Sequence, residues 1–255
     1  MKISNDIKTE MDALIANNIG FNEMYQELQL KYTITVGEIT LIGESQGTIP
    51  CWTCKINQNE ITIESPLASR DIESFVHELL HGILDSKGFS ETKIVLNWIN
   101  KLPHPIPFLL GEPNLLGHIN NSLAHEKMYP YYDAHGFNPE NFVLDYALCP
   151  VQDAYMDCIN SDFYNAGLPN DAIGVYIGQF IACRYCLNDT FLPQIRECLN
   201  TLHTINNDLY DLCEEFLVEW STIPERHNLA HIIRFAYKVR DWYNTNKGLF
   251  INGIS

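Results

Sequence analysis

Residues 31–64 carry the strand-like part of this sequence, and they limit the fold that the chain can adopt. Four short segments rich in Thr, Ile and Val alternate there with Gly, Pro, Asn and Gln: KYTITV, EITLIG, CWTCKI and EITIE. Short runs of β-branched residues between turn formers are typical of strands. Apolar residues elsewhere recur mainly at helical spacing. We therefore expect an α+β protein in which a small mixed or antiparallel sheet near the N-terminus packs on a helix, followed by a mostly helical C-terminal half.

Helices are expected on both sides of the strands. Residues 4–30 carry apolar side chains at helical spacing, with Gly20 as a stop. Residues 69–87 show the same spacing, and Gly88 follows them as a second stop. The stretch 101–114 is rich in proline, so we expect a connecting loop there.

The rest of the chain is predicted to be helical. Residues 115–129 form one expected helix. Residues 151–243 form several more, with breaks near the prolines at positions 169, 193 and 224. No internal repeat or low-complexity linker separates these segments.

Charge restricts the partners of this chain. Its formal net charge is −16. Because a polyanionic surface repels phosphate groups, we expect neither a nucleic acid nor an anionic membrane as a partner. The N-terminal residues lack the apolar core of a signal peptide, and the most apolar stretch, residues 172–183, is too short to cross a bilayer. We therefore expect a cytoplasmic protein whose eight cysteines are reduced.

One motif in the expected helix 69–87 carries chemistry, namely His77-Glu78-Leu79-Leu80-His81. Two histidines four residues apart project from one face of a helix, and their imidazoles can occupy two positions around a zinc ion. Glu78 follows the first histidine, where a carboxylate can take a proton from a water that the metal activates. We predict one Zn²⁺ per chain, bound by His77 and His81, with Glu78 as general base.

A third ligand is expected on the helix at residues 115–129. At 100° per residue His118, His125 and Tyr129 fall on one stripe of that helix. We predict His125 as the ligand, and Glu126, one position further along the chain, stays open as the alternative. His118 and Tyr129 are candidates for further contacts, and a tyrosine hydroxyl can donate a hydrogen bond to an oxyanion.

The segment HELLHGILDSKG resembles the zincin metallopeptidases, especially the small bacterial and phage zincins that include the ImmA/IrrE-like group. The resemblance covers roughly residues 30–136, and its one highly specific motif is His77 to His81. Leu84 and Lys87 stand where metzincins need Gly and His, so a gluzincin-like arrangement is implied. The Asn-x-x-x-His pattern that ends at His125 also matches the small zincins. The resemblance further implies a peptide or protein substrate, bound in extended form along an edge strand.

We accordingly assign residues 1–136 to a zincin-like metal-binding catalytic domain and residues 137–255 to a helical region packed on it as one globular unit. The leading hypothesis is a zinc metallopeptidase. The alternative is a regulatory protein-binding module on the same scaffold, of phage or mobile-element type, with little or no protease activity. Both hypotheses stay open at this point.

Two other patterns are interpreted as structural. Cys51-Trp-Thr-Cys54 and Cys183-Arg-Tyr-Cys186 lie far apart and lack the glycines of a zinc knuckle, so we expect their thiols to pack in the core. The pair in His227-Asn-Leu-Ala-His231 has no glutamate after its first histidine. It therefore lacks a base for hydrolysis.

Overall fold

The computed structural model describes residues 13, 16, 17, 19–38, 53–65, 72–142, 149–164 and 171–251. By contacts between Cα atoms the chain divides into two compact units. The first consists of Met1–Lys87 and Met128–Leu144, and the second of Gly88–Lys127 and Asp145–Ser255. The sequence analysis assigned residues 1–136 to a catalytic domain and residues 137–255 to a helical region. Because that assignment concerns function, the two compact units do not test it, and it stays a prediction.

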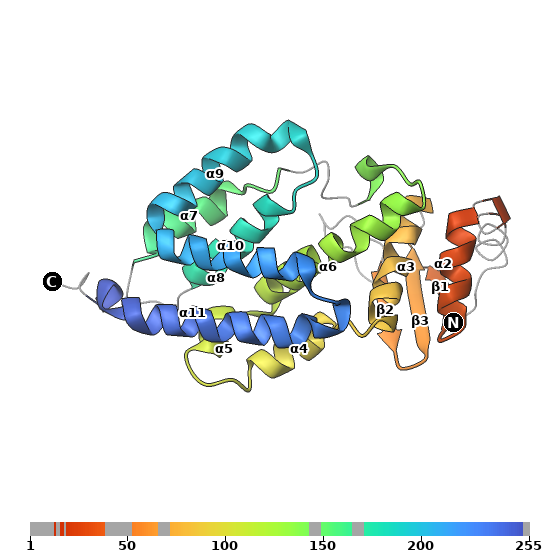
Figure 1. The fold of residues 1–255 in the computed structure, drawn as a ribbon, viewed down its shortest axis with the longest axis horizontal. Helices are drawn as coiled ribbons and strands as arrows, with labels where there is room; N and C mark the ends of the chain where they lie inside the picture. The colour runs from red at the N-terminus through yellow and green to blue at the C-terminus, as the bar shows by residue number, and fades with distance from the viewer. Residues whose placement is uncertain are drawn as a thin grey trace. The chain divides into compact units, whose positions relative to one another are not determined.

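A three-stranded mixed sheet lies in the first unit (Figure 1). Its strands are β1 (Thr33–Glu38), β2 (Thr53–Asn57) and β3 (Glu60–Ser65), in the order β1-β3-β2. β1 runs parallel to β3 with Thr33 opposite Glu60, and β2 runs antiparallel to β3 with Thr53 opposite Glu64. Of the expected strand at 38–43, only Glu38 belongs to the described residues. The predicted α+β class, with a small mixed sheet before a mostly helical half, is confirmed.

Helices α2 (Ile19–Gln29) and α3 (Ile72–Ser86) pack on the sheet and on each other. The side chains between these elements form the core of the unit. Among them Phe21, Leu28, Ile61, Ile63, Phe75 and Leu79 are fully buried. Removing this apolar surface from water is the main favourable contribution to the folding of such a layer. The core thereby fixes α3 against the sheet.

Gly82 allows this close approach of α3. A Cβ atom built on Gly82 would lie 2.7 Å from Cδ1 of Ile61 on β3, and 3.3 Å from both methyl carbons of Leu28 on α2. These are contacts that a larger side chain cannot make without displacing its neighbours. Gly82 follows directly after His81, so this close packing lies directly beside the motif.

Two glycines bear on the expected helix ends. Gly88 follows α3 with a φ of 87°, a left-handed conformation that suits glycine, and the predicted stop is confirmed. The predicted stop at Gly20 is wrong, because Gly20 lies inside α2. A Cβ atom there would lie 2.9 Å from the Cβ atom of His135, so the residue is small because of packing.

We expect Gly82→Val to destabilise the protein by about 1–3 kcal/mol, since its branched Cβ enters a filled core. Gly82→Ala should be far milder, because the end of the flexible Ile61 side chain can move away. Urea denaturation of both variants measures this difference. Gly248→Val in α11 (Asn228–Ile251) is the control, since a Cβ atom there meets nothing within 4 Å. A Gly82→Val protein as stable as the wild type would contradict the packing argument.

The described part of the second unit is helical. It contains α4 (Thr92–Ile99), α5 (Ile106–Leu110), the first turns of α6 (Pro113–Ala134), α7 (Asp153–Asp162), α8 (Asp171–Arg184), α9 (Leu192–Ile205), α10 (Asn207–Thr222) and α11 (Asn228–Ile251). Single 3₁₀ turns lie at Asp189–Phe191 and Glu225–His227, and a third lies in the first unit at Pro139–Asn141. α8 contacts α5, α7, α9 and α10, and α11 contacts α4, α5 and α10 (Figure 1). α8 is therefore a central helix of this unit.

Two glycines of α8 bring it close to the start of α6. A Cβ atom on Gly174 would lie 2.3 Å from Cδ2 of Leu115, and one on Gly178 would lie 2.9 Å from Cδ1 of the same side chain. Leu115 thus fits against a face of α8 that carries no side chain at these positions. This contact holds the first turns of α6 in the second unit.

The prolines account for most of the differences between the predicted and observed helices. The stretch 101–114 is not only a loop, because it contains α5 and the first residues of α6. Pro107 and Pro113 lie in the first turns of these helices, where the missing N–H group has no partner to lose. Pro130 lies inside α6, which continues past the expected end at residue 129.

The predicted helix breaks in the second unit are partly confirmed. Pro224 separates α10 from α11, and Pro193 lies in the first turn of α9. The break near Pro169 lies outside the described residues. A further break, between α9 and α10, was not predicted, and Asn206 explains it. The Asn206 side chain accepts a hydrogen bond from the backbone N–H of Leu209 at 2.8 Å and caps α10.

Within the described residues, none of the helices combines the length and the apolar character needed to cross a membrane. The cysteines in this part of the chain are all free thiols, namely Cys54, Cys149, Cys158, Cys183, Cys186, Cys198 and Cys213.

His231 of α11 is buried against α10 as a neutral ring. Its Nε2 atom lies 3.1 Å from the carbonyl oxygen of Phe216, so the ring donates from this nitrogen. Its Nδ1 atom accepts from Arg234 at 3.3 Å and lies 3.6 Å from a carboxylate oxygen of Glu219. Burial lowers the pKa of His231, and Arg234 and Lys238 lower it further, while the Phe216 carbonyl and Glu219 act in the opposite direction.

We expect this histidine to make the fold sensitive to acid. The folded protein binds the second proton of the His231 ring less readily than the unfolded chain, whose histidine pKa is about 6.5. The stability that the buried neutral His231 ring allows is therefore fully present above a pH of about 6.5, and it is lost as the pH falls below this value. In His231→Gln, which can still donate to Phe216, the urea midpoint should fall less between pH 7.5 and pH 5.5 than in the wild type. Equal falls in both proteins would refute the role of His231.

Candidate metal centre

His77 and His81 lie on one face of α3, one turn apart. Their ring centroids are 5.1 Å apart, with the ring planes inclined at 77°. Phe75 and Val76 precede the motif and Leu79 and Leu80 lie within it, and all four are buried in the core. Because the core holds these apolar residues, it leaves the two imidazoles, which are partly exposed, on the remaining face of α3. The expected arrangement of this pair is therefore present.

A backbone carbonyl orients the first of these rings. Nδ1 of His77 lies 2.8 Å from the carbonyl oxygen of Phe142. Because a carbonyl oxygen can only accept, the proton of a neutral His77 ring lies on Nδ1. Nε2 is then left with a lone pair for a metal ion. Metal-binding histidines commonly donate their other N–H group in this way.

Aromatic side chains hold the Phe142 residue in place. Its ring lies 5.3 Å from the His77 ring, 5.5 Å from the Tyr129 ring and 4.9 Å from the Tyr132 ring, measured between centroids. Tyr132 in turn packs on Phe137, with 5.1 Å between the ring centroids. Tyr129 and Tyr132 belong to the last turns of α6. The chain that leaves α6 is thereby fixed beside His77.

Lys87 and Tyr131 add a second contact between α6 and the end of α3. Nζ of Lys87 donates to the hydroxyl of Tyr131 at 2.8 Å, and the same ammonium group lies 4.3 Å from the centroid of the Tyr131 ring. The last turns of α6 are therefore held at two places along α3.

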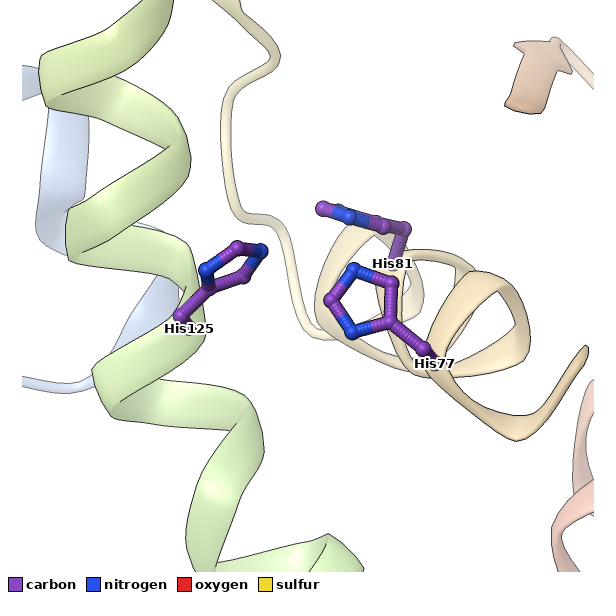
Figure 2. Close-up of side chains that lie close together, drawn as sticks. All are labelled: His77, His81 and His125. Atoms are coloured by element: carbon purple, nitrogen blue, oxygen red, sulfur yellow. The ribbon is translucent and has the colours of Figure 1, made fainter. Parts of the chain in front are cut away.

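His125, one turn before Tyr129 on α6, joins the two histidines of α3. Each of His77, His81 and His125 offers a ring nitrogen, and these three atoms lie within 4.8 Å of one another. Figure 2 shows the three rings turned toward a common point, two from α3 and one from α6. Among the described residues this is the one group of three or more His, Cys, Asp or Glu side chains that meets this distance. The three histidines could hold a metal ion.

Although the two imidazoles of α3 are partly exposed, their withdrawal from bulk water keeps them in their neutral form. It lowers the pKa of His77 to about 3, with a further decrease from His81 and an opposing increase from the Phe142 carbonyl. Burial also lowers the pKa of His81 to about 4. A neutral imidazole is the form that binds metal ions. At neutral pH both rings are therefore ready to donate lone pairs.

Glu78 is the most buried acidic side chain of the motif helix, with 8% of its surface exposed. Burial raises the pKa of its carboxyl group to about 7. The next residue toward the N-terminus is His77, so the carboxyl group and the first imidazole leave α3 at adjacent positions. The helix thus carries an acid–base group beside two neutral nitrogen donors.

The donor set fits zinc. Three imidazoles with one open position are the ligands of a known type of catalytic zinc site. Nitrogens bound to one zinc ion at about 2.0–2.1 Å lie roughly 3.4 Å apart in a tetrahedral arrangement. The three ring nitrogens of this group lie within 4.8 Å of one another, a distance on the same scale as that spacing.

The alternative ligand Glu126 does not belong to the group of histidines in the described structure. Its carboxylate lies 3.6 Å from the ammonium group of Lys127, and that group donates to the carbonyl oxygen of Trp220 at 2.7 Å. Glu126 is therefore paired with Lys127, and Lys127 in turn contacts the end of α10.

The two candidates for further contacts are placed differently. His118 lies near Gly178 of α8, whose built Cβ would be 3.8 Å from the His118 ring, and it is not part of the group of histidines. Tyr129 lies one turn after His125, with its ring against Phe142.

The Phe142 carbonyl was not predicted as part of the centre. No side-chain pattern could have indicated it, because the functional group belongs to the backbone.

Comparison of the chain with protein-family models, with curated proteins and with solved structures gives no match in any of the three. The case for a metal centre therefore rests on the residues of this chain alone.

We expect purified protein without a histidine tag to bind one zinc ion per chain. His125→Ala removes one of three nitrogen donors, so its zinc affinity should fall by more than the roughly 10–100-fold typical of losing an outer hydrogen-bond partner. Glu126→Gln and His118→Ala on the same helix should keep the wild-type affinity. Competition with a chromophoric chelator measures all four proteins. A loss in Glu126→Gln without a loss in His125→Ala would show that the third donor is wrongly assigned.

Proposed function

We propose that this chain is a zinc-dependent hydrolase, and that it is a metallopeptidase of the zincin type. The observation that carries the proposal is the group of His77, His81 and His125, with Glu78 beside the first of them on α3. Three nitrogen donors alone fit many metal sites. A buried carboxylate next to them in the helix is what hydrolysis by an activated water requires.

Each residue of the centre has a separate task in this reaction. His77, His81 and His125 would hold a zinc ion, and Phe142 fixes the ring of His77. The ion would supply Lewis-acid chemistry that lowers the pKa of a water. Glu78 takes the proton of the attacking water on its carboxylate and passes it to the leaving nitrogen of the substrate.

The proposed substrate class is a peptide or protein. The resemblance of the motif helix to zincins favours it, and so does the small sheet beside α3. Among the described strands β2 lies at an edge of the sheet, and an extended peptide can pair with such an edge. Tyr129 is our candidate for a hydrogen bond to the carbonyl oxygen of the substrate. We place the reaction in the cytoplasm, where thiols stay reduced.

We expect Glu78→Gln to keep one zinc ion per chain while hydrolysis falls by about 10²–10⁴-fold, since the amide cannot take a proton. Unfolded casein and a peptide library serve as substrates, and activity of the wild type should disappear with a chelator and return with zinc. Glu73→Gln, five residues earlier on α3 and partly exposed, is the matched control and should leave both properties unchanged.

Two results would contradict the proposal. Full activity of Glu78→Gln would exclude Glu78 as the base. Wild-type protein with a full complement of zinc but no chelator-sensitive cleavage would favour the alternative, a regulatory binding module that keeps the metal centre without its chemistry.

A further inference from the structure

The chain that leaves α6 returns to α3 within the first unit. Helix α6 ends at Ala134, and Gly136 turns the backbone with a φ of 77°. Residues 137–142, which we call the clasp, follow this turn and include the 3₁₀ turn Pro139–Asn141. The clasp and α3 both belong to the first compact unit. The contacts between them are therefore contacts within one unit.

The clasp is anchored by the phenylalanines at its two ends. Phe137 is 7% exposed and Phe142 is 1% exposed. Both rings pack on Tyr132, with centroid distances of 5.1 Å and 4.9 Å. The backbone N–H of Asn141 donates to the carbonyl oxygen of Asn138 at 3.0 Å, a bond within the clasp itself. A short segment held at its ends in this way can open while the sheet and α3 stay folded.

Two polar contacts join the clasp to α3. Nδ1 of His77 donates to the carbonyl oxygen of Phe142 at 2.8 Å. The second contact, from Nδ2 of Asn141 to Oε1 of Glu73, is exposed and 3.4 Å long, so it contributes little. The ring that binds the clasp is therefore the first imidazole of the group of histidines.

The two nitrogens of the His77 ring influence each other. A metal ion on Nε2 would withdraw electron density from the ring, and the Nδ1–H group would then donate more strongly to the Phe142 carbonyl. When the clasp opens, the carbonyl leaves, and the ring proton is free to move to Nε2, where it blocks the ion. Docking of the clasp and binding of the ion thus favour each other. Two such events change each other's equilibrium by the same factor.

We propose that the clasp regulates the candidate metal centre: a divalent ion on His77 holds residues 137–142 closed on α3, and opening of the clasp weakens the binding of the ion. The inference rests on the zinc binding of the proposed function, but not on the hydrolytic step. A partner that draws the clasp away from α3 would thereby lower the metal affinity of the protein.

Hydrogen exchange, followed by mass spectrometry on the native full-length protein with and without saturating zinc, tests the coupling. We expect zinc to slow exchange in a peptide that covers the clasp by roughly 10–100-fold, the range over which an outer hydrogen-bond partner changes metal affinity. A peptide that covers α2 is the control in the same unit. Its exchange should slow much less, because local opening of α2 leaves the bond between His77 and Phe142 in place.

Two substitutions separate this coupling from ordinary packing. Phe142→Ala and Phe21→Ala each remove a fully buried ring from the first unit, and Phe21 also packs beside α3, 5.3 Å from the Phe75 ring between centroids. Only Phe142→Ala should lower the zinc affinity, by a factor of the same order as the slowing of exchange in the wild-type clasp. Phe142→Leu keeps an apolar anchor and should regain most of the affinity. Competition with a chromophoric chelator measures all four proteins.

The exchange measurement on the wild type decides the question even if a variant fails to fold. Zinc binding without slower exchange in the clasp would overturn the coupling and leave the metal centre intact. Equal losses of affinity in Phe142→Ala and Phe21→Ala would also overturn it, since residue 142 would then act through general packing. A wild-type protein that binds no zinc would refute the metal centre of the proposed function, and the coupling with it.

Discussion

The hydrogen bond between Nδ1 of His77 and the carbonyl oxygen of Phe142 connects the motif helix to the chain that follows α6. A buried ring N–H without a partner costs roughly 1–3 kcal/mol, so a partner must be supplied once α3 is packed on the sheet. Supplying it from a carbonyl has two consequences at once. It fixes the proton on Nδ1, and it ties the aromatic group around Phe142 to α3. Because Tyr129 and Tyr132 belong to that group, the end of α6 is held by the same interaction that prepares His77 for a metal ion.

Polar groups of the candidate metal centre are buried at some expense of stability. Burial disfavours the charged forms of His77, His81 and Glu78. A chain selected for stability alone would place apolar residues at such positions. Their environment instead leaves two neutral nitrogen donors and one acid with a pKa near neutrality. Perturbed groups of this kind cluster at functional sites more often than elsewhere.

Local periodicity was enough to predict the parts of the centre that lie on single helices. The spacing of His77 and His81 and the position of His125 on its helix are visible in the sequence, and the structure brings these three residues together. The α+β class followed from strand-like segments confined to one stretch. Contacts between residues far apart in the sequence could not be predicted from local patterns. The Phe142 carbonyl leaves no trace in local patterns, and prolines in the first turns of helices resemble those in loops.

All three nitrogen donors lie on helices, and this bears on how well a metal ion can be held. Ligand atoms must lie within a few tenths of an ångström of their ideal distances. A metal ion therefore binds less tightly when the backbone that holds its ligands is mobile. Helix α3, which holds two of the three donors, is anchored by its apolar residues. At Gly82 the absence of a side chain lets the helix approach β3 directly beside His81. The donor positions on α3 are therefore set by the packing of the core. The small sheet has a role even without a catalytic side chain, since it is the surface that makes this packing rigid.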